Sequence, residues 1–178
     1  MIIREATNTE RQSVLDIERR AFGYDKEAHL VADMLGDPTA EPRLSLLASK
    51  NGRDVGHILF TAVTLVGAEA PVTASILAPL AVVPEAQAQG VGGTLITEGL
   101  RLLKASGVGL VFVLGHPGYY PRHGFQPAGR LGLHAPYPIP DEQADAWMVQ
   151  ALQDGLIGSI TGTVQCAETL SRPEHWRE

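Results

Sequence analysis

The chain has 178 residues, of which 44% are hydrophobic and 19% charged, enough for one domain with a core of its own. Its formal net charge is −6, and no segment concentrates Lys or Arg, so we expect no nucleic-acid partner. No apolar stretch reaches the roughly 20 residues that span a bilayer, so we expect no insertion into a membrane.

The single cysteine and the first residues predict the compartment. Cys166 has no partner for an internal disulfide, and within a β pattern we expect it to be buried and unreactive. The opening MIIREATNTE lacks the basic and apolar regions of a secretory signal. We therefore expect a cytoplasmic protein.

The first residues combine a strand pattern with two helix patterns. Residues 2–6 predict a short strand, and Thr7 or Asn8 can cap the helix that follows it. A second helix is expected over residues 26–35.

A hairpin and two buried strands are expected next. Residues 43–66 predict the hairpin, because Asn51 and Gly52 favour the positive φ of its turn. The apolar run 74–84 predicts a central strand covered on both faces. An amphipathic helix separates it from another buried strand, residues 110–115, and a crossover helix of this kind makes two strands parallel neighbours or near neighbours.

The remainder, from Arg130 on, continues the same mixed pattern. We expect a Pro-rich loop, a short helix around Trp147 and an alternating strand over residues 159–170. No repeat or linker separates this part, so we expect one domain of mixed α/β structure.

The glycine-rich turn PEAQAQGVGG, residues 84–93, lies between the apolar strand and the amphipathic helix. Free N–H groups and the positive end of the dipole make such a helix start an anion site, most naturally for phosphate or pyrophosphate. It is not a P-loop, because Thr94 and Leu95 follow the last glycine where Lys and Ser or Thr are needed. Leu95 also stands where the dinucleotide fingerprint requires glycine.

Two motifs carry a family resemblance. Gln87, Gly90 and Gly92 form a QxxGxG pattern between a buried strand and a long helix, which resembles the acyl-CoA-binding motif of the GNAT N-acetyltransferase superfamily. The second motif is VFVLGHPGYYPRHGF, in which Tyr120 stands four residues before Gly124 and Phe125.

The second segment, in the form LGHPxYYPRxGF, is similar to one bacterial branch of the superfamily. The resemblance covers roughly residues 2–130 and implies a mixed, mostly antiparallel central sheet with one parallel, splayed strand pair and flanking helices. It implies a single domain over residues 1–178, with a helix and strand extension from about residue 130.

The implied function is transfer of an acetyl group from acetyl-CoA to a primary amine of a small molecule or peptide by direct attack. In the family, backbone groups of the strand before the turn pair with the pantetheine arm, here at Leu80, Ala81 and Val82. The residues that the resemblance assigns to the turn around the cofactor are Gln87, Ala88, Gln89, Gly90, Val91, Gly92 and Gly93. A homodimer is compatible with the resemblance.

The chemistry needs a free amine, an oxyanion donor and a proton for the leaving thiolate. By resemblance, Tyr120 is the acid and the Val82 amide is the oxyanion donor. His116 is the best-placed candidate for the base, although it can equally fix the turn before Pro117, and a water relay can replace a single base. Weaker candidates are Glu85, His57 and Glu69.

Other aromatic and histidine side chains have structural interpretations. We expect Tyr119 to pack beside the cofactor, and His123 to face either the thiol or the surface. Trp147, Trp176 and Tyr137 are expected to anchor the core or its edge, and a role in enclosing the acceptor is the alternative. His116 and His123 lack helical ligand spacing and a third partner, so no metal site is assigned.

Two other classes of function remain open. A CoA-responsive binding or regulatory module would keep the turn without turnover, which the retained Tyr120 disfavours. A nicotinamide oxidoreductase is disfavoured by Leu95. Titration with acetyl-CoA, CoA and NAD, together with an assay of thiol release, separates the three.

Overall fold

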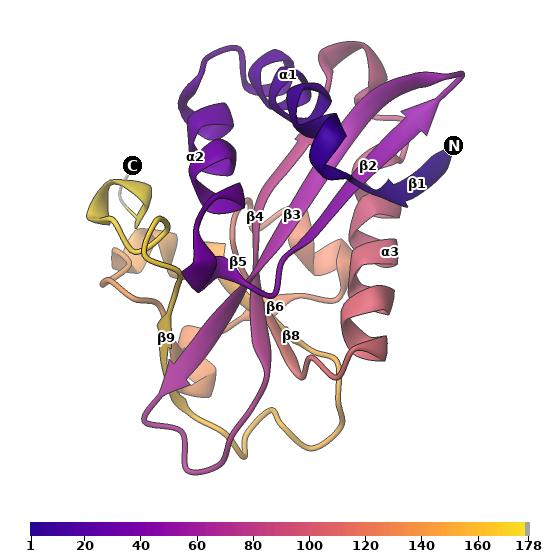
Figure 1. Ribbon diagram of the computed structural model, residues 1–178. Helices are drawn as coiled ribbons and strands as arrows, with labels where there is room; N and C mark the ends of the chain where they lie inside the picture. Colours follow the sequence, from indigo (N-terminus) through magenta and orange to yellow (C-terminus); the bar gives the residue numbers. More distant parts are fainter. Residues whose placement is uncertain (177–178) are drawn as a thin grey trace.

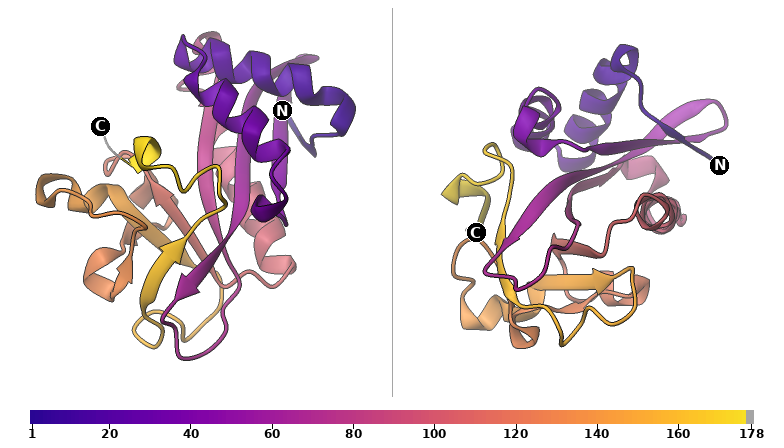
Figure 2. Two further views of the ribbon diagram at one scale, coloured as in Figure 1. Left: turned by 60° about the vertical axis from the view of Figure 1, so that its left-hand side comes forward. Right: turned by 60° about the horizontal axis from the view of Figure 1, so that its bottom comes forward.

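The computed structural model describes residues 1–176, in which nine strands form one mixed sheet with helices on both faces (Figures 1 and 2). The strands are β1 (Ile2–Glu5), β2 (Leu44–Lys50), β3 (Arg53–Val66), β4 (Ala74–Val82), β5 (Leu110–Leu114), β6 (Gln126–Pro127), β7 (Leu133–His134), β8 (Trp147–Ala151) and β9 (Gly162–Gln165). The α-helices are α1 (Arg11–Phe22), α2 (Lys26–Leu35) and α3 (Val91–Ala105), and short 3₁₀ helices include η2 (Pro38–Ala40), η4 (Tyr120–His123), η6 (Asp141–Ala146) and η7 (Pro173–Trp176).

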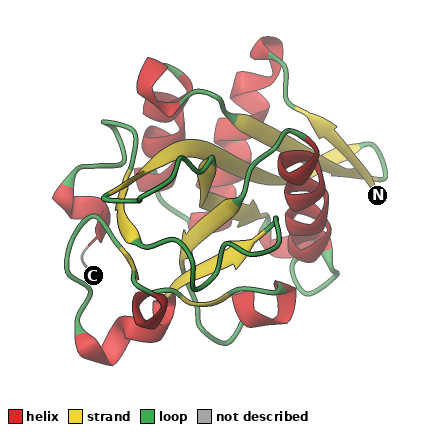
Figure 3. Ribbon diagram, turned by 90° about the horizontal axis from the view of Figure 1, so that it is seen from below, coloured by secondary structure: helices red, strands yellow, loops and turns green. Residues whose placement is uncertain are grey.

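The sheet has the strand order β1-β2-β3-β4-β5-β8-β6, and β9 pairs with the far end of β3 and with β7. Strands β4 and β5 are parallel, as are β7 and β9, and the other pairs are antiparallel. Seen from below, the sheet is strongly twisted (Figure 3). The predicted fold class, mostly antiparallel with a parallel pair, is confirmed.

The hairpin of β2 and β3 has the predicted turn. Asn51 and Gly52 have φ of 53° and 76°, as expected for a two-residue hairpin turn. Strand β3 is long enough to pair with β2 and β4 along one part and with β9 at its end.

Side chains of β3 on opposite faces of the sheet support different helices. Phe60 packs against Gly99 of α3, where a Cβ would lie 2.3 Å from the phenyl ring. His57, on the other face, contacts Glu18 of α1 at 2.7 Å. Helices α1 and α2 therefore cover one face and α3 the other (Figure 2).

Strands β4 and β5 separate at one end. Their pairing runs from Ala74 opposite Leu110 to Leu77 opposite Val113. Beyond that point β5 soon ends, whereas β4 continues to Val82 beside β3, with a register shift near its middle. The backbone of β4 therefore has an unpaired side over its last residues.

Two expectations for the C-terminal part need correction. Trp147 does not lie in a helix: the helical turn is η6, and Trp147 begins β8, which pairs with β5 inside the sheet. Short apolar runs such as WMVQA do not distinguish strand from helix by periodicity. The alternating pattern over residues 159–170 forms a strand only at β9.

A buried carboxylate fixes the C-terminal segment. Asp37 Oδ1 accepts hydrogen bonds from the N–H and Oγ of Thr39 at 2.9 and 2.6 Å, and Oδ2 accepts from the N–H and Oγ of Thr169 at 3.0 and 2.8 Å. Burial alone would raise the pKa of Asp37, but these hydrogen bonds outweigh it and hold the pKa well below its usual range.

We predict that Asp37→Ala lowers the free energy of unfolding by about 2 to 4 kcal/mol, because it leaves the buried hydroxyl and N–H of Thr169 without an acceptor. Urea denaturation measures the effect. The matched control is Asp33→Ala, which removes an exposed ion pair to Arg172 at 3.5 Å and should cost below about 1 kcal/mol. Equal losses in the two variants would contradict the role of Asp37.

The stability contribution of Asp37 also depends on pH. Because its pKa is lower in the folded than in the unfolded chain, the contribution is complete above the unfolded value near 3.8 and is lost as the pH falls below it. In Asp37→Ala, this part of the acid destabilisation should be missing.

Candidate active site

The free end of β4 offers backbone groups to the gap beside β5. Val83 N–H donates to Val55 C=O at 2.9 Å, and hydrogen-bonded pairs alternate along an antiparallel ladder. With Ala81 opposite His57, Ala81 turns its N–H and C=O toward β3. Leu80 and Val82 therefore turn their N–H and C=O groups away from β3. These are two of the three residues assigned to pantetheine, and their backbone groups are free of the sheet.

The turn after β4 is shaped by left-handed residues. Ala88 and Gly90 have φ of 60° and 83°, and α3 begins at Val91. The Gln87 side chain donates to Val82 C=O at 3.0 Å, which ties the turn to the strand. Successive N–H groups in such a turn, together with the start of α3, make a concave site for an anion.

A cavity of about 480 Å³ lies against this turn. It is lined by Leu80, Val82, Ala86, Gln87, Ala88, Gly90, Val91, Gly92, Gly93, Tyr119, Arg122 and His123. The two motifs meet here, because a Cβ on Gly92 would lie 2.6 Å from Tyr119 Oη, and one on Gly93 would lie 3.0 Å from His123 Cε1. Side chains at these two positions would therefore meet Tyr119 and His123 at the start of α3.

Arg122 adds a positive charge to this cavity that the sequence analysis did not assign. Its guanidinium lies 5.9 Å from the centre of the Tyr119 ring, and its Nε donates to Gly118 C=O at 3.1 Å. The signal in the sequence was a basic residue two positions after Tyr120, and only the fold brings it to the anion site.

An inner cavity of about 410 Å³ opens between the ends of β4 and β5 and helix α2. Its walls are Phe22, Lys26, Glu27, Leu30, Ile76, Leu77, Ala78, Pro79, Leu80, Val113, Leu114, Gly115, His116, Tyr119, Tyr120, Leu170, His175 and Trp176. Tyr119 and Leu80 line both cavities. The anion site and the inner cavity therefore meet at the free end of β4.

Tyr120 packs against the end of β5. A Cβ on Gly115 would lie 2.4 Å from the Tyr120 ring, and the ring makes edge contacts with Tyr119 and Phe125 at centroid distances of 5.1 and 5.7 Å. Burial, and to a lesser extent the charge of Tyr119, raise the pKa of Tyr120 above its usual range. The hydroxyl therefore keeps its proton at neutral pH.

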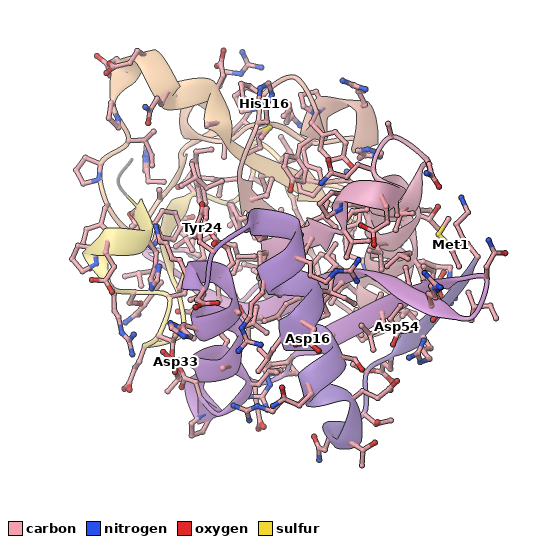
Figure 4. The ribbon with its side chains drawn as sticks, turned by 90° about the horizontal axis from the view of Figure 1, so that it is seen from above. Met1, Asp16, Tyr24, Asp33, Asp54 and His116 are labelled. Atoms are coloured by element: carbon pink, nitrogen blue, oxygen red, sulfur yellow. The ribbon has the colours of Figure 1, made fainter. Side chains whose placement is uncertain are left out.

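His116 lines the inner cavity and an outer cavity of about 660 Å³ next to it. Figure 4 labels His116 in the loop after β5 and Tyr24 in the link between α1 and α2, and both line the outer cavity. His116 Nδ1 accepts a hydrogen bond from Gly118 N–H at 3.0 Å. In a neutral imidazole this bond places the ring hydrogen on Nε2, so that Nε2 is a donor.

The weaker candidates for the base lie elsewhere. Glu85 is exposed and forms an ion pair with Arg20. His57 is fully buried between Glu18 and Ser45, at 2.7 and 2.8 Å. Glu69 lies in the exposed loop between β3 and β4. Within the described residues, His57 and Glu69 line none of the three cavities above.

The aromatic anchors occupy the expected places. Trp147 stacks on Phe112 with a centroid distance of 5.2 Å and contacts Trp176 edge to face at 5.5 Å. Tyr137 Oη donates to Ser171 C=O at 2.5 Å. Cys166 is buried as predicted, and burial raises the pKa of its thiol to about 12, which makes it a poor nucleophile.

Across residues 1–176, no three His, Cys, Asp or Glu side chains come close enough together to hold a metal ion. In the same range, no helix has the length and apolar character needed to cross a bilayer.

Comparison with known proteins identifies the family. A family model described as an acetyltransferase (GNAT) domain matches residues 2–128. The chain is 50% identical to the uncharacterized N-acetyltransferase YjhQ of Escherichia coli K12 over 161 residues, which cover 90% of this chain and 88% of that protein.

Solved structures agree with this result. The GNAT-family N-acetyltransferase YhbS from Escherichia coli, crystallised in complex with CoA, has a TM-score of 0.85 and 31% identity, covering 96% of this chain and 92% of that one. A GNAT-family acetyltransferase from Brucella melitensis, in complex with acetyl-CoA, has a TM-score of 0.74 and 26% identity, covering 95% of this chain and 97% of that one. The chain belongs to the GNAT family and is an N-acetyltransferase, as the two motifs predict.

Proposed function

We propose that this enzyme transfers an acetyl group from acetyl-CoA to a primary amine that enters the inner cavity. Acetyl-CoA is its co-substrate. The observation that carries the proposal is the continuity of three features: a left-handed glycine turn at the start of α3, the free backbone edge of β4, and the cavity lined by Tyr120.

The residues present fit a CoA molecule. The N–H groups from Ala88 to Gly93 are the ones we assign to its pyrophosphate, with Arg122 as a further cation beside them. The pantetheine arm would pair with the outward N–H and C=O groups of Leu80 and Val82. The acyl group would then lie near the Val82 N–H, which we assign as the oxyanion donor.

Tyr120 is suited to relay a proton. A phenol whose pKa is raised is a weak acid. A thiol has a pKa of about 8.5, so its thiolate is a weaker base than the phenolate of Tyr120. We infer that Tyr120 gives its proton to the departing sulfur while it receives one from the nitrogen that has just formed the amide bond. The carbon–sulfur bond breaks, the carbon–nitrogen bond forms, and no phenolate accumulates.

The proposed acceptor is a small-molecule or peptide amine. The location of the enzyme in the cell is also part of the proposal. We propose a cytoplasmic enzyme, because one cysteine in 178 residues is typical of a chain that folds without disulfides. A homodimer remains part of the expectation from the family and is tested by light scattering of the purified protein.

The turn can be tested with Gly92→Asp, which places a side chain and a negative charge in front of the α3 N–H groups. We predict that affinity for CoA, measured by calorimetry, falls at least tenfold, a change of about 1.4 kcal/mol. Gly129→Asp is the control, since no atom lies within 4 Å of a Cβ at that position. Unchanged CoA binding by a folded Gly92→Asp protein would reject the assignment.

If His116 accepts the amine proton, His116→Ala should remove the acidic limb of the rate profile and be partly rescued at high pH, where free amine is abundant. The bond from Gly118 favours the other interpretation, in which Nε2 already carries hydrogen. A profile that keeps its acidic limb would leave His116 as a residue of the turn.

Tyr120→Phe keeps the ring and removes the hydroxyl. We predict CoA affinity within a few-fold of the parent and acyl transfer slower by about 10² to 10⁴, equivalent to roughly 3 to 5 kcal/mol. Donors with a low-pKa leaving thiol should suffer less, because such a thiolate departs unaided. Single-turnover rates with thioesters of different thiol pKa measure this dependence.

The control for Tyr120→Phe is Tyr137→Phe, which removes a hydroxyl that bonds to Ser171 and should show no dependence on the leaving thiol. Equal slowing of Tyr120→Phe with all donors would show that Tyr120 is not the acid, and loss of acetyl-CoA binding would make it a cofactor contact.

A further inference from the structure

The inner cavity is apolar on the side of α1, α2 and the C-terminal segment. Phe22, Leu30, Leu170 and Trp176 form this part of its wall. Glu27 is the one acidic residue among the described residues that line the cavity. A carboxylate in such a wall needs a partner, because an unpaired buried acceptor loses its hydration without compensation.

Glu27 is half-buried, and one of its two carboxylate oxygens is buried without a partner within residues 1–176. Its Oε2 atom is shielded from solvent and accepts no hydrogen bond. The neighbouring carboxylate of Glu18 is in a similar position, because its Oε2 bonds to His57 Nδ1 at 2.7 Å while its Oε1 is buried and unpaired. Burial raises the pKa of Glu18, and the charge of Glu27 raises it further by a smaller amount. The region between α1 and α2 therefore favours a cation.

The other ionisable groups around the cavity do not neutralise Glu27. Lys26 is exposed and lines both the inner and the outer cavity. The imidazole of His175 has a pKa lowered by burial, so it is neutral at pH 7, and its Nε2 is also buried and unpaired. His116 and the hydroxyls of Tyr119 and Tyr120 complete the set, and none of these groups bonds to Glu27 within the described part of the chain.

We propose that Glu27 binds the ammonium group of the acceptor, and that the acceptor is a primary amine with an apolar body and no carboxylate on the carbon that bears the amino group. This inference rests on the proposed function. The charged end pairs with Glu27 on binding, and the apolar body packs against Leu30 and Trp176. One ammonium proton passes to solvent water before the nitrogen attacks the thioester. A carboxylate beside the amine would lie next to Glu27, where like charges repel in a poorly hydrated cavity.

The size of the cavity agrees with this class of acceptor. A volume of about 410 Å³ is within the range of small-molecule sites, roughly 300 to 1,000 Å³. A compact amine such as 2-phenylethylamine is therefore a suitable probe.

The first experiment compares kcat/KM for 2-phenylethylamine and phenylalanine with acetyl-CoA. We expect a higher kcat/KM for 2-phenylethylamine than for phenylalanine. We expect Glu27→Gln to lower kcat/KM for 2-phenylethylamine by about 10- to 100-fold, mainly by raising KM, because the variant loses a hydrogen bond to a charged group. Glu27→Asp, which keeps the charge, should retain part of the activity. Glu69→Gln removes the same charge far from the cavity and should match the parent.

The second experiment measures binding of 2-phenylethylamine and 2-phenylethanol to the CoA-loaded protein by calorimetry. We expect the amine to bind more tightly than the alcohol, and this difference to disappear in Glu27→Gln. If the parent binds the amine in this way but acetylates nothing, the proposed function fails and the role of Glu27 stands.

The inference itself is overturned by any of three results. The first is a Glu27→Gln protein whose kcat/KM and affinity for 2-phenylethylamine are within twofold of those of the parent. The second is an equal kcat/KM of the parent for phenylalanine and 2-phenylethylamine. The third is a parent that binds the amine and the alcohol equally tightly, or binds neither.

Discussion

The separation of β4 from β5 after Leu77 and Val113 is the constraint on which the site depends. A strand inside a sheet normally pairs its N–H and C=O groups on both sides, and buried backbone groups are rarely left without partners. In this protein β4 runs on to Val82 with β3 on one side only. The outward groups of Leu80 and the outward N–H of Val82 therefore need an extended ligand or water, whereas Val82 C=O already accepts from Gln87. Leu80 also lines the inner cavity, so this free edge lies against it.

The turn and the tyrosine segment complete each other across this gap. Gly92 of the turn leaves room for the Tyr119 hydroxyl, and within the tyrosine segment Gly115 leaves room for the Tyr120 ring. Both contacts are too close for a side chain, so Gly92 helps to determine where the Tyr119 ring of the other segment can lie. The two motifs act as one structural unit, which explains why their joint presence is more specific than either alone.

The sequence predicted the parts of this unit that depend on local patterns. The turn of the hairpin, the helix after the glycines and the parallel pair of strands follow from residues close together in the chain. Trp147 was assigned to a helix because the short apolar run WMVQA has no periodicity that distinguishes a buried strand from a short helix. Arg122 and Glu27 were missed because their importance comes from tertiary neighbours: Arg122 meets the turn at α3, and Glu27 shares a cavity with residues from the C-terminus.

The two halves of the site thus have different origins. The cofactor half is built from residues 77 to 125, inside the segment that the family model matches. Part of the acceptor wall, Leu170, His175 and Trp176, lies beyond that segment, and the hydrogen bonds between Asp37 and Thr169 hold it near α2. A fold can keep its cofactor chemistry while such a wall changes. With the inner cavity as the proposed acceptor site, acceptor choice depends on how the end of the chain packs against α2, which the GNAT motifs do not determine.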